Sequence, residues 1–285
     1  MLMLLALGCA SAQSEDAAVA PTAASRTIER VALLPTEARR AADLESAFPD
    51  DSVVRIGDGD DRAIGVFRKS LDEPALGVVV VVLGSSIAPD AVNDSTRLRR
   101  ALPRGRWSTL AVVLPDVPNE VFPPRQRDKF VEGVAAQPAS GQPPPIPPQT
   151  AVNAAQAAMP ARVRARLDAA VKIAREKGSR VVVLGEDAAG AWITWAQSQG
   201  LGADAIVAID TARSSPPIDG QLPKDTLAAL ATPALLLMET PHHWSLDDRL
   251  ATRVDLRQLP PGDPAGFRLE RRIRGWLKSR FDSRG

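Results

Sequence analysis

The sequence predicts an α/β fold with a mostly parallel central sheet covered by helices on both faces. Two observations predict it. Short runs of β-branched and other apolar residues recur along the 285-residue chain, and amphipathic helical patterns lie between them. Continuous apolar runs are typical of strands buried on both faces. Strands that alternate with helices form right-handed crossovers within a parallel sheet.

The strands are justified in chain order. Residues 52–56 and 63–67 flank a turn rich in aspartate and glycine, so we expect these two strands to pair as a hairpin. Five continuous apolar runs follow and are expected to be buried strands: residues 77–83, 109–114, 180–184, 205–209 and 234–238. Residues 253–259 are expected to supply the last strand.

Two segments have the periodicity of amphipathic helices. The apolar residues of the first fall on one helical face: Val163, Leu167, Ala170, Val171 and Ala174. The basic residues of this segment, including Arg166, are predicted to lie largely elsewhere, and Gly178 is predicted to end the helix. Near the end of the chain, the second helix is marked by Leu269, Ile273, Trp276 and Leu277.

Composition excludes several classes of function. The 35 basic and 34 acidic residues leave a net charge of +1, so nucleic acid is not an expected partner. A single cysteine, Cys9, excludes an intramolecular disulfide and a cysteine-based zinc site. Because the sequence contains neither a metal-ligand spacing nor a phosphate-binding glycine loop before a helix, no metal and no cofactor are expected.

The start of the chain has the pattern of an export signal. Residues 2–8 are almost wholly apolar but too few to span a bilayer, so no transmembrane helix is expected there. The small residues 10–12 fit the cleavage rule of secretory signal peptides. We therefore expect a signal peptide over 1–12 and export to the periplasm. Gly8 before Cys9 leaves a lipid anchor at Cys9 as the alternative, which would make the protein a membrane-anchored lipoprotein.

The rest of the chain is predicted to form a flexible segment over residues 13–28 and a single domain over residues 29–285. One stretch inside that domain, residues 137–149, is rich in proline. Proline cannot sustain a helix or an inner strand, so we expect an exposed loop inserted into the domain. A linker between domains is the alternative, but predicted strands of the sheet lie on both sides of this stretch.

Residues 181–192 read as a strand, a tight turn of small residues and the start of a helix. This is the layout of the nucleophile elbow, in which a sharp strand-to-helix turn exposes the nucleophile of the G-x-S-x-G pattern. Gly185 matches the first glycine, Ala189 replaces the second, and Asp187 occupies the nucleophile position. The amide of Ala188 would then stabilise an oxyanion, and Ser85, after the strand 77–83, would lie at the second oxyanion position.

Three stretches resemble the DUF3530 family, exported bacterial proteins of unassigned function within the α/β-hydrolase superfamily. They are the valine-rich strand followed by residues 98–103, the segment 105–109 leading to 113–115, and residues 273–277. The resemblance covers most of the chain from about residue 29. It implies the α/β-hydrolase fold, but its motifs are structural and imply no particular reaction.

Aspartate at the elbow has a precedent in this superfamily. Haloalkane dehalogenases and epoxide hydrolases attack through aspartate, and a histidine-activated water then cleaves the ester intermediate. Such a mechanism needs a histidine after the last strand, where this chain has Asp263 and no histidine. The two histidines of the chain, His242 and His243, instead follow Glu239, which comes after the penultimate strand.

Two interpretations of these residues remain open. In the first, Asp187 caps the following helix and the adjacent histidines pack in a loop, so the catalytic site is degenerate. The protein would then bind a small molecule or a periplasmic protein without catalysis. In the alternative, it is an unusual hydrolase of esters, epoxides or haloalkanes. Asp187 would attack, His242 or His243 would act as the base, and Glu239 or Asp263 would orient that base.

Overall fold

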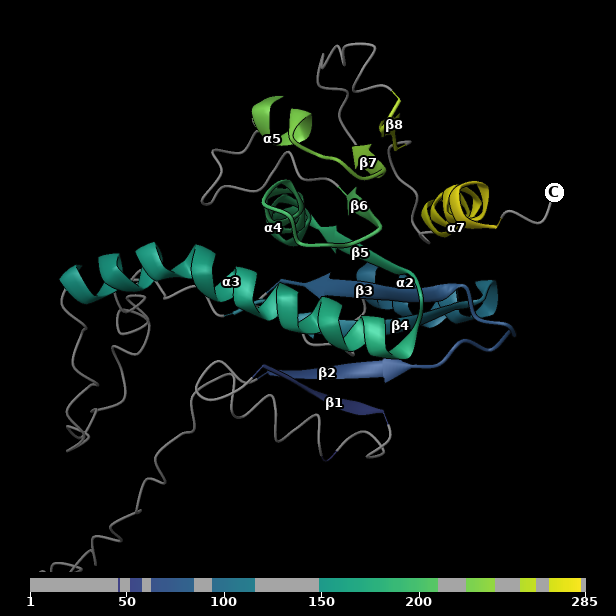
Figure 1. The fold of residues 1–285 in the computed structure, drawn as a ribbon, viewed down its shortest axis with the longest axis horizontal. Coiled ribbons are helices and arrows are strands. Elements are labelled where there is room, and N and C mark those ends of the chain that lie inside the picture. The colour runs from purple at the N-terminus through teal and green to yellow at the C-terminus, as the bar shows by residue number, and fades with distance from the viewer. Residues whose placement is uncertain are drawn as a thin grey trace, which may run out of the picture. The chain divides into compact units, whose positions relative to one another are not determined.

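The computed structural model describes residues 46, 52–57, 63–84, 94–115, 149–209, 224–238, 252–259 and 267–282. Cys9, the predicted signal peptide and the segment 13–28 lie outside them. The described part of the chain forms an eight-stranded sheet with the strand order β1-β2-β4-β3-β5-β6-β7-β8 (Figure 1). The strands are β1 (Val53–Ile56), β2 (Ala63–Arg68), β3 (Gly77–Leu83), β4 (Trp107–Val113), β5 (Val181–Glu186), β6 (Ala205–Ile209), β7 (Ala234–Met238) and β8 (Val254–Gln258).

The sheet is parallel except at one edge. β1 and β2 form the predicted antiparallel hairpin, and β2 pairs antiparallel with β4. From β4 to β8 all neighbouring strands are parallel. β3 is central in this arrangement: β4, the next strand in the chain, pairs with one side of β3, and β5 pairs with its other side. Ligands in such sheets bind beyond the carboxyl ends of the strands where the order reverses, which here is the junction of β3 and β5.

The alternation of side chains along β3 divides the core into two layers. Val78, Val80 and Val82 pack with residues of α3 (Gln149–Lys177) and α4 (Asp187–Ser198). Val79, Val81 and Leu83 point to the opposite face. There they pack with α2 (Asp94–Ala101), the 3-10 helix η2 (Leu102–Gly105) and α7 (Phe267–Phe281). Both faces of the sheet are therefore covered, as the continuous apolar runs predict (Figure 1).

Helix α3 is longer than the apolar pattern predicts. It begins at Gln149, the last residue of the predicted proline-rich loop. The remainder of that loop, residues 137–148, is not among the described residues. Most side chains from 153 to 158 are exposed, so hydrophobic periodicity does not mark these turns. Their alanine content, which favours helix, is the sequence signal that accounts for them.

The predicted core face of α3 is confirmed, with one correction among its basic residues. The five apolar residues on that face, Val163, Leu167, Ala170, Val171 and Ala174, are all buried. Arg166 is also buried, with 4% of its surface exposed, and its Nη1 donates a hydrogen bond to the carbonyl oxygen of Val113. A hydrogen bond to a main-chain oxygen offsets part of the cost of burying a guanidinium, and the apolar pattern alone does not reveal that acceptor.

Two short helices were not predicted. α2 has a polar sequence, and α5 (Lys224–Ala228) comprises five residues, too few for a periodic pattern to emerge. Within the described ranges, no helix combines the length and the apolar character that are needed to cross a membrane.

Candidate functional site

The turn between β5 and α4 depends on a glycine. A Cβ atom added to Gly185 would lie 2.7 Å from the carbonyl carbon of Ala189 and 2.9 Å from its oxygen. Gly185 and Glu186 still pair with β6, so the strand continues to the first residue of the helix. Strand and helix therefore meet more closely than any side chain would allow, as the elbow layout requires.

Asp187 has a strained backbone at this turn. It is the first residue of α4, its φ angle is +50°, and it is exposed. Among the described residues, the only other non-glycine residue with a positive φ is Arg106. The left-handed region costs a residue other than glycine about 1–2 kcal/mol, and somewhat less for aspartate. The structure thus places Asp187 on the sharp turn that presents the nucleophile in the elbow layout.

The cap position of α4 is one residue earlier than predicted. It falls on Glu186, which has an extended backbone and whose side chain makes no capping hydrogen bond. Asp187 lies instead within the first turn, where a carboxylate interacts favourably with the helix dipole.

Replacing Asp187 with glycine is expected to raise the free energy of unfolding by about 1 kcal/mol, because glycine adopts a positive φ without strain. If the main contribution of Asp187 were to stabilise the start of the helix, the same change would instead lower the free energy of unfolding. Urea unfolding of Asp187→Gly beside the wild type measures the sign. A destabilised variant would show that Asp187 serves the helix rather than a site.

The residue before Asp187 is anchored to the opposite layer. Ser95, buried on α2, donates a hydrogen bond from Oγ to Oε2 of Glu186 at 3.0 Å. This contact ties the elbow to the helix that precedes β4. Sequence reasoning missed Ser95 because it lies in a short polar helix 91 residues away in the chain.

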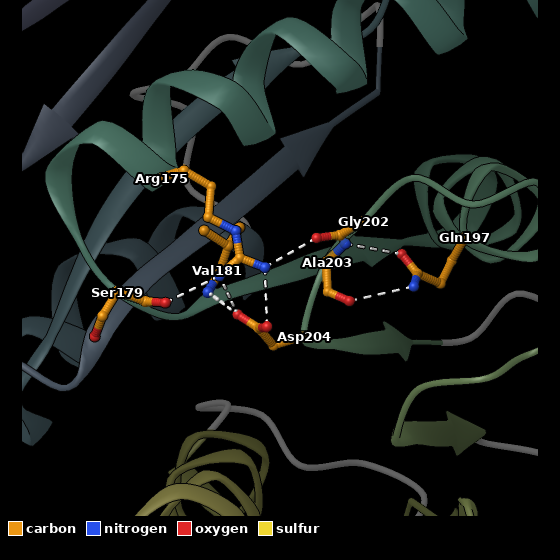
Figure 2. Close-up of polar contacts among 7 residues, drawn as sticks. All are labelled: Arg175, Ser179, Val181, Gln197, Gly202, Ala203 and Asp204. Atoms are coloured by element: carbon orange, nitrogen blue, oxygen red, sulfur yellow. Dashed lines mark hydrogen bonds and ion pairs between the residues drawn. The ribbon is translucent and has the colours of Figure 1, made fainter.

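A second polar network holds the other ends of β5 and α4 (Figure 2). The carboxylate of Asp204 accepts hydrogen bonds from both Nη atoms of Arg175, at 2.6 and 2.9 Å, and from the Val181 amide at 2.6 Å. The buried amide of Gln197 bonds to both the N–H and the carbonyl oxygen of Ala203. Together these contacts fix the start of β5 and the exit from α4, and thereby the strand and helix that carry the elbow.

Two tryptophans of α4 pack in the core. Trp192 is buried and Trp195 is half-buried, and their rings meet edge to face with centroids 5.5 Å apart. They support the helix that follows Asp187 by burying large apolar surfaces.

The structure brings two of the predicted site residues together: Asp187 and Ala188, which are consecutive at the elbow, with Ala188 half-buried. The other predicted residues, Ser85, Glu239, His242, His243 and Asp263, lie outside the described residues. In the chain they follow β3, β7 and β8, all of which run parallel to β5. Within the described ranges, no three histidine, cysteine, aspartate or glutamate side chains are grouped closely enough to hold a metal ion.

The fold is that of the α/β hydrolases. The chain is similar to Est1E from Butyrivibrio proteoclasticus, with 8% identity, a TM-score of 0.54, and coverage of 81% of this chain and 100% of that one. It is also similar to a dienelactone hydrolase from Anabaena variabilis, with 12% identity, a TM-score of 0.50, and coverage of 80% and 96%. Identities this low establish the fold alone.

Comparison by sequence points to one family. A family model described as a protein of unknown function, DUF3530, matches residues 1–245. The match includes two of the three stretches that carry the resemblance and ends before the third, residues 273–277. No curated protein sequence matches this chain.

Proposed function

Since this chain belongs to the DUF3530 family and has the α/β-hydrolase fold, we propose that it is an exported ligand-binding protein with a degenerate catalytic site. The observation that supports this proposal is the exposed carboxylate of Asp187, held at the nucleophile position where a serine hydrolase has its serine. The turn is retained, but the group that it presents is different.

The chemistry of a carboxylate supports binding over turnover. Attack by aspartate on an epoxide or a haloalkane forms an alkyl ester, and attack on an ester releases the alcohol and forms a mixed anhydride. Either intermediate is resolved by a water, which a histidine activates in the enzymes that use this mechanism. The segment between β8 and α7, residues 259–266, contains no histidine. A carboxylate accepts hydrogen bonds and pairs with cations. The ligand class that fits is therefore one with amino or hydroxyl groups, on a small molecule or on a periplasmic protein.

One observation favours a second candidate function, an aspartate-based hydrolase of esters, epoxides or haloalkanes. A positive φ at a non-glycine residue destabilises the fold, and such strain is concentrated at functional sites. In this candidate, Asp187 attacks and His242 or His243 activates the water, oriented by Glu239 or Asp263. The amide of Ala188 and the second oxyanion position at Ser85 hold the developing negative charge.

A hydrolysis assay separates the two candidates. Wild type and Asp187→Asn are compared on p-nitrophenyl acetate, styrene oxide and 1-chlorobutane, with Glu176→Gln as the control for loss of an exposed carboxylate. Asparagine has the shape of aspartate and also tolerates a positive φ. We expect equal background rates for all three proteins. A wild-type rate about tenfold or more above that of Asp187→Asn, with Glu176→Gln at the wild-type rate, would establish the hydrolase.

A thermal-shift screen tests binding directly. The probes are a panel of primary amines and a panel of sugar alcohols, each at millimolar concentration. A ligand that binds only the folded state raises Tm, so a hit is expected to stabilise wild type and Glu176→Gln but not Asp187→Asn. If every hit also stabilises Asp187→Asn, the elbow carboxylate is not the binding group.

A further inference from the structure

A second candidate site lies at the other end of the strands from the elbow. A pocket of about 690 Å³ is lined by Trp107 and the three residues before it, by Asp72 and Leu76, and by residues of α7 and Asp282 just after it. Trp107 is the first residue of β4 and pairs with Gly77, the first residue of β3. The elbow follows the last residue of β5. The pocket is therefore at the amino ends of the parallel strands and is separate from the elbow.

Basic residues outnumber acidic ones in the walls of this pocket. Its five cationic residues are Arg104, Arg106, Arg271, Arg274 and Lys278. The last three recur at intervals of three and four residues along α7, which places them on one face of the helix. Three carboxylates also line the pocket, those of Asp72, Glu270 and Asp282, which leaves a formal excess of two positive charges.

Two of the carboxylates already have partners. Arg106 contacts Asp282 at 3.4 Å, and Arg274 contacts Glu270 at 3.0 Å. In the part of the chain that the structure describes, no ion pair involves the exposed side chains of Arg104, Arg271 or Lys278. The positive charge of the pocket is thus not neutralised by its own acids.

The helix dipole does not account for this arrangement. A cation in the last turn of a helix, such as Lys278, interacts favourably with the dipole. Arg271 is the fifth residue of α7, near the end where the dipole favours acids instead. Arg104 lies on the other wall, in η2. Positive side chains from two separate segments therefore face the same space.

Glycine keeps that space open. A Cβ atom at Gly275 would meet nothing within 4 Å, and one at Gly105 would lie 3.1 Å from Nε of Arg274. Both glycines line the pocket, together with the buried Trp107 and the half-buried Leu76. A larger residue at Gly275 would extend into the pocket without displacing the neighbouring atoms.

We propose that this pocket binds a phosphate group, on a soluble phosphate ester or on the headgroup of an anionic lipid. The guanidinium groups of Arg104 and Arg271 each present a planar set of donors that matches phosphate oxygens, and Lys278 adds a compact charge. The half-buried Leu76 offers an apolar surface that suits the carbon skeleton to which the phosphate is attached. This binding is independent of Asp187 and of the function proposed for the elbow.

The test removes the three cations together. Wild type and the variant Arg104→Gln/Arg271→Gln/Lys278→Gln are titrated with glycerol 3-phosphate by calorimetry. Each is also sedimented with vesicles of phosphatidylglycerol or, for comparison, phosphatidylcholine. We expect wild type to bind at least one phosphate-bearing probe and the variant to bind it about tenfold or more weakly. Binding to glycerol 3-phosphate identifies a soluble ester as the source, and binding only to phosphatidylglycerol vesicles identifies a lipid.

Two controls make the result specific. The variant Arg100→Gln/Lys172→Gln/Arg280→Gln loses the same charge from exposed positions that do not line the pocket, and is expected to bind as wild type does. Gly275→Phe retains every charge but fills the space, and is expected to bind as weakly as the pocket variant. The proposal is overturned if wild type binds neither probe, if the control variant loses as much affinity, or if Gly275→Phe binds normally.

Discussion

Replacing Gly185 with alanine is expected to lower the free energy of unfolding by about 3 kcal/mol. The added Cβ would lie 2.7 Å from the carbonyl carbon of Ala189 and 2.9 Å from the nitrogen of Gly190. Both are backbone atoms, so no side-chain rotation relieves the contact. Instead α4 must move away from β5, which disturbs the buried contacts on either side of the turn. Urea unfolding followed by circular dichroism measures the loss.

Gly275→Ala provides the matched control, because the same methyl group is added where no atom lies within 4 Å. Gly275 lies within α7, and alanine stabilises a helix interior relative to glycine by about 0.5–1 kcal/mol. The two variants are therefore expected to shift stability in opposite directions. Similar effects at both positions would show that β5 and α4 do not approach each other as closely as the structure places them.

Replacing Asp204 with alanine is expected to lower the free energy of unfolding by about 2–3 kcal/mol. Its carboxylate is the acceptor for the amide of Val181, a residue with no exposed surface, and for both Nη atoms of Arg175. The Arg175–Asp204 ion pair is about one-third exposed on each side and contributes only about 0–1 kcal/mol. Most of the loss therefore comes from leaving the Val181 amide without its acceptor.

Two further variants separate these contributions, with the same unfolding measurement. Asp204→Asn keeps an oxygen that can accept from the Val181 amide, and is expected to recover more than half of the stability lost in the alanine variant. Arg175→Gln removes the ion pair together with the exposed hydrogen bonds from Arg175 to the carbonyl oxygens of Ser179 and Gly202, and leaves the Asp204–Val181 bond. Its expected effect is about 1 kcal/mol. If Arg175→Gln is as unstable as Asp204→Ala, the contacts of Arg175 are the principal contribution.

The strands could be predicted because their signal is local. Residues 77–83 are all buried, as their unbroken apolar run predicts, and the hairpin forms as its turn residues predict. The ends of strands were less predictable. β5 continues through Gly185 and Glu186 because those residues pair with β6, and pairing depends on a neighbouring strand rather than on the residues themselves.

Features that join distant segments were not predictable from the same patterns. The buried Arg166 donates a hydrogen bond to the carbonyl oxygen of Val113, and nothing in a helical pattern shows that acceptor. The contact between Ser95 and Glu186 joins α2 to the end of β5, across 91 positions of the chain. The basic pocket likewise requires η2 and α7 to lie together, although the chain between them includes most of the sheet.

The sequence by itself determined the fold class and the position of the elbow. The apolar runs, Gly185 and Asp187 lie in the order that a parallel sheet and a strand-to-helix turn require, and short-range patterns carry that information. Only the tertiary structure decided that Asp187 has a positive φ, and that Glu186 is bound to α2. A strained backbone angle persists only where the surrounding packing holds it, and that packing comes from residues far away in the chain.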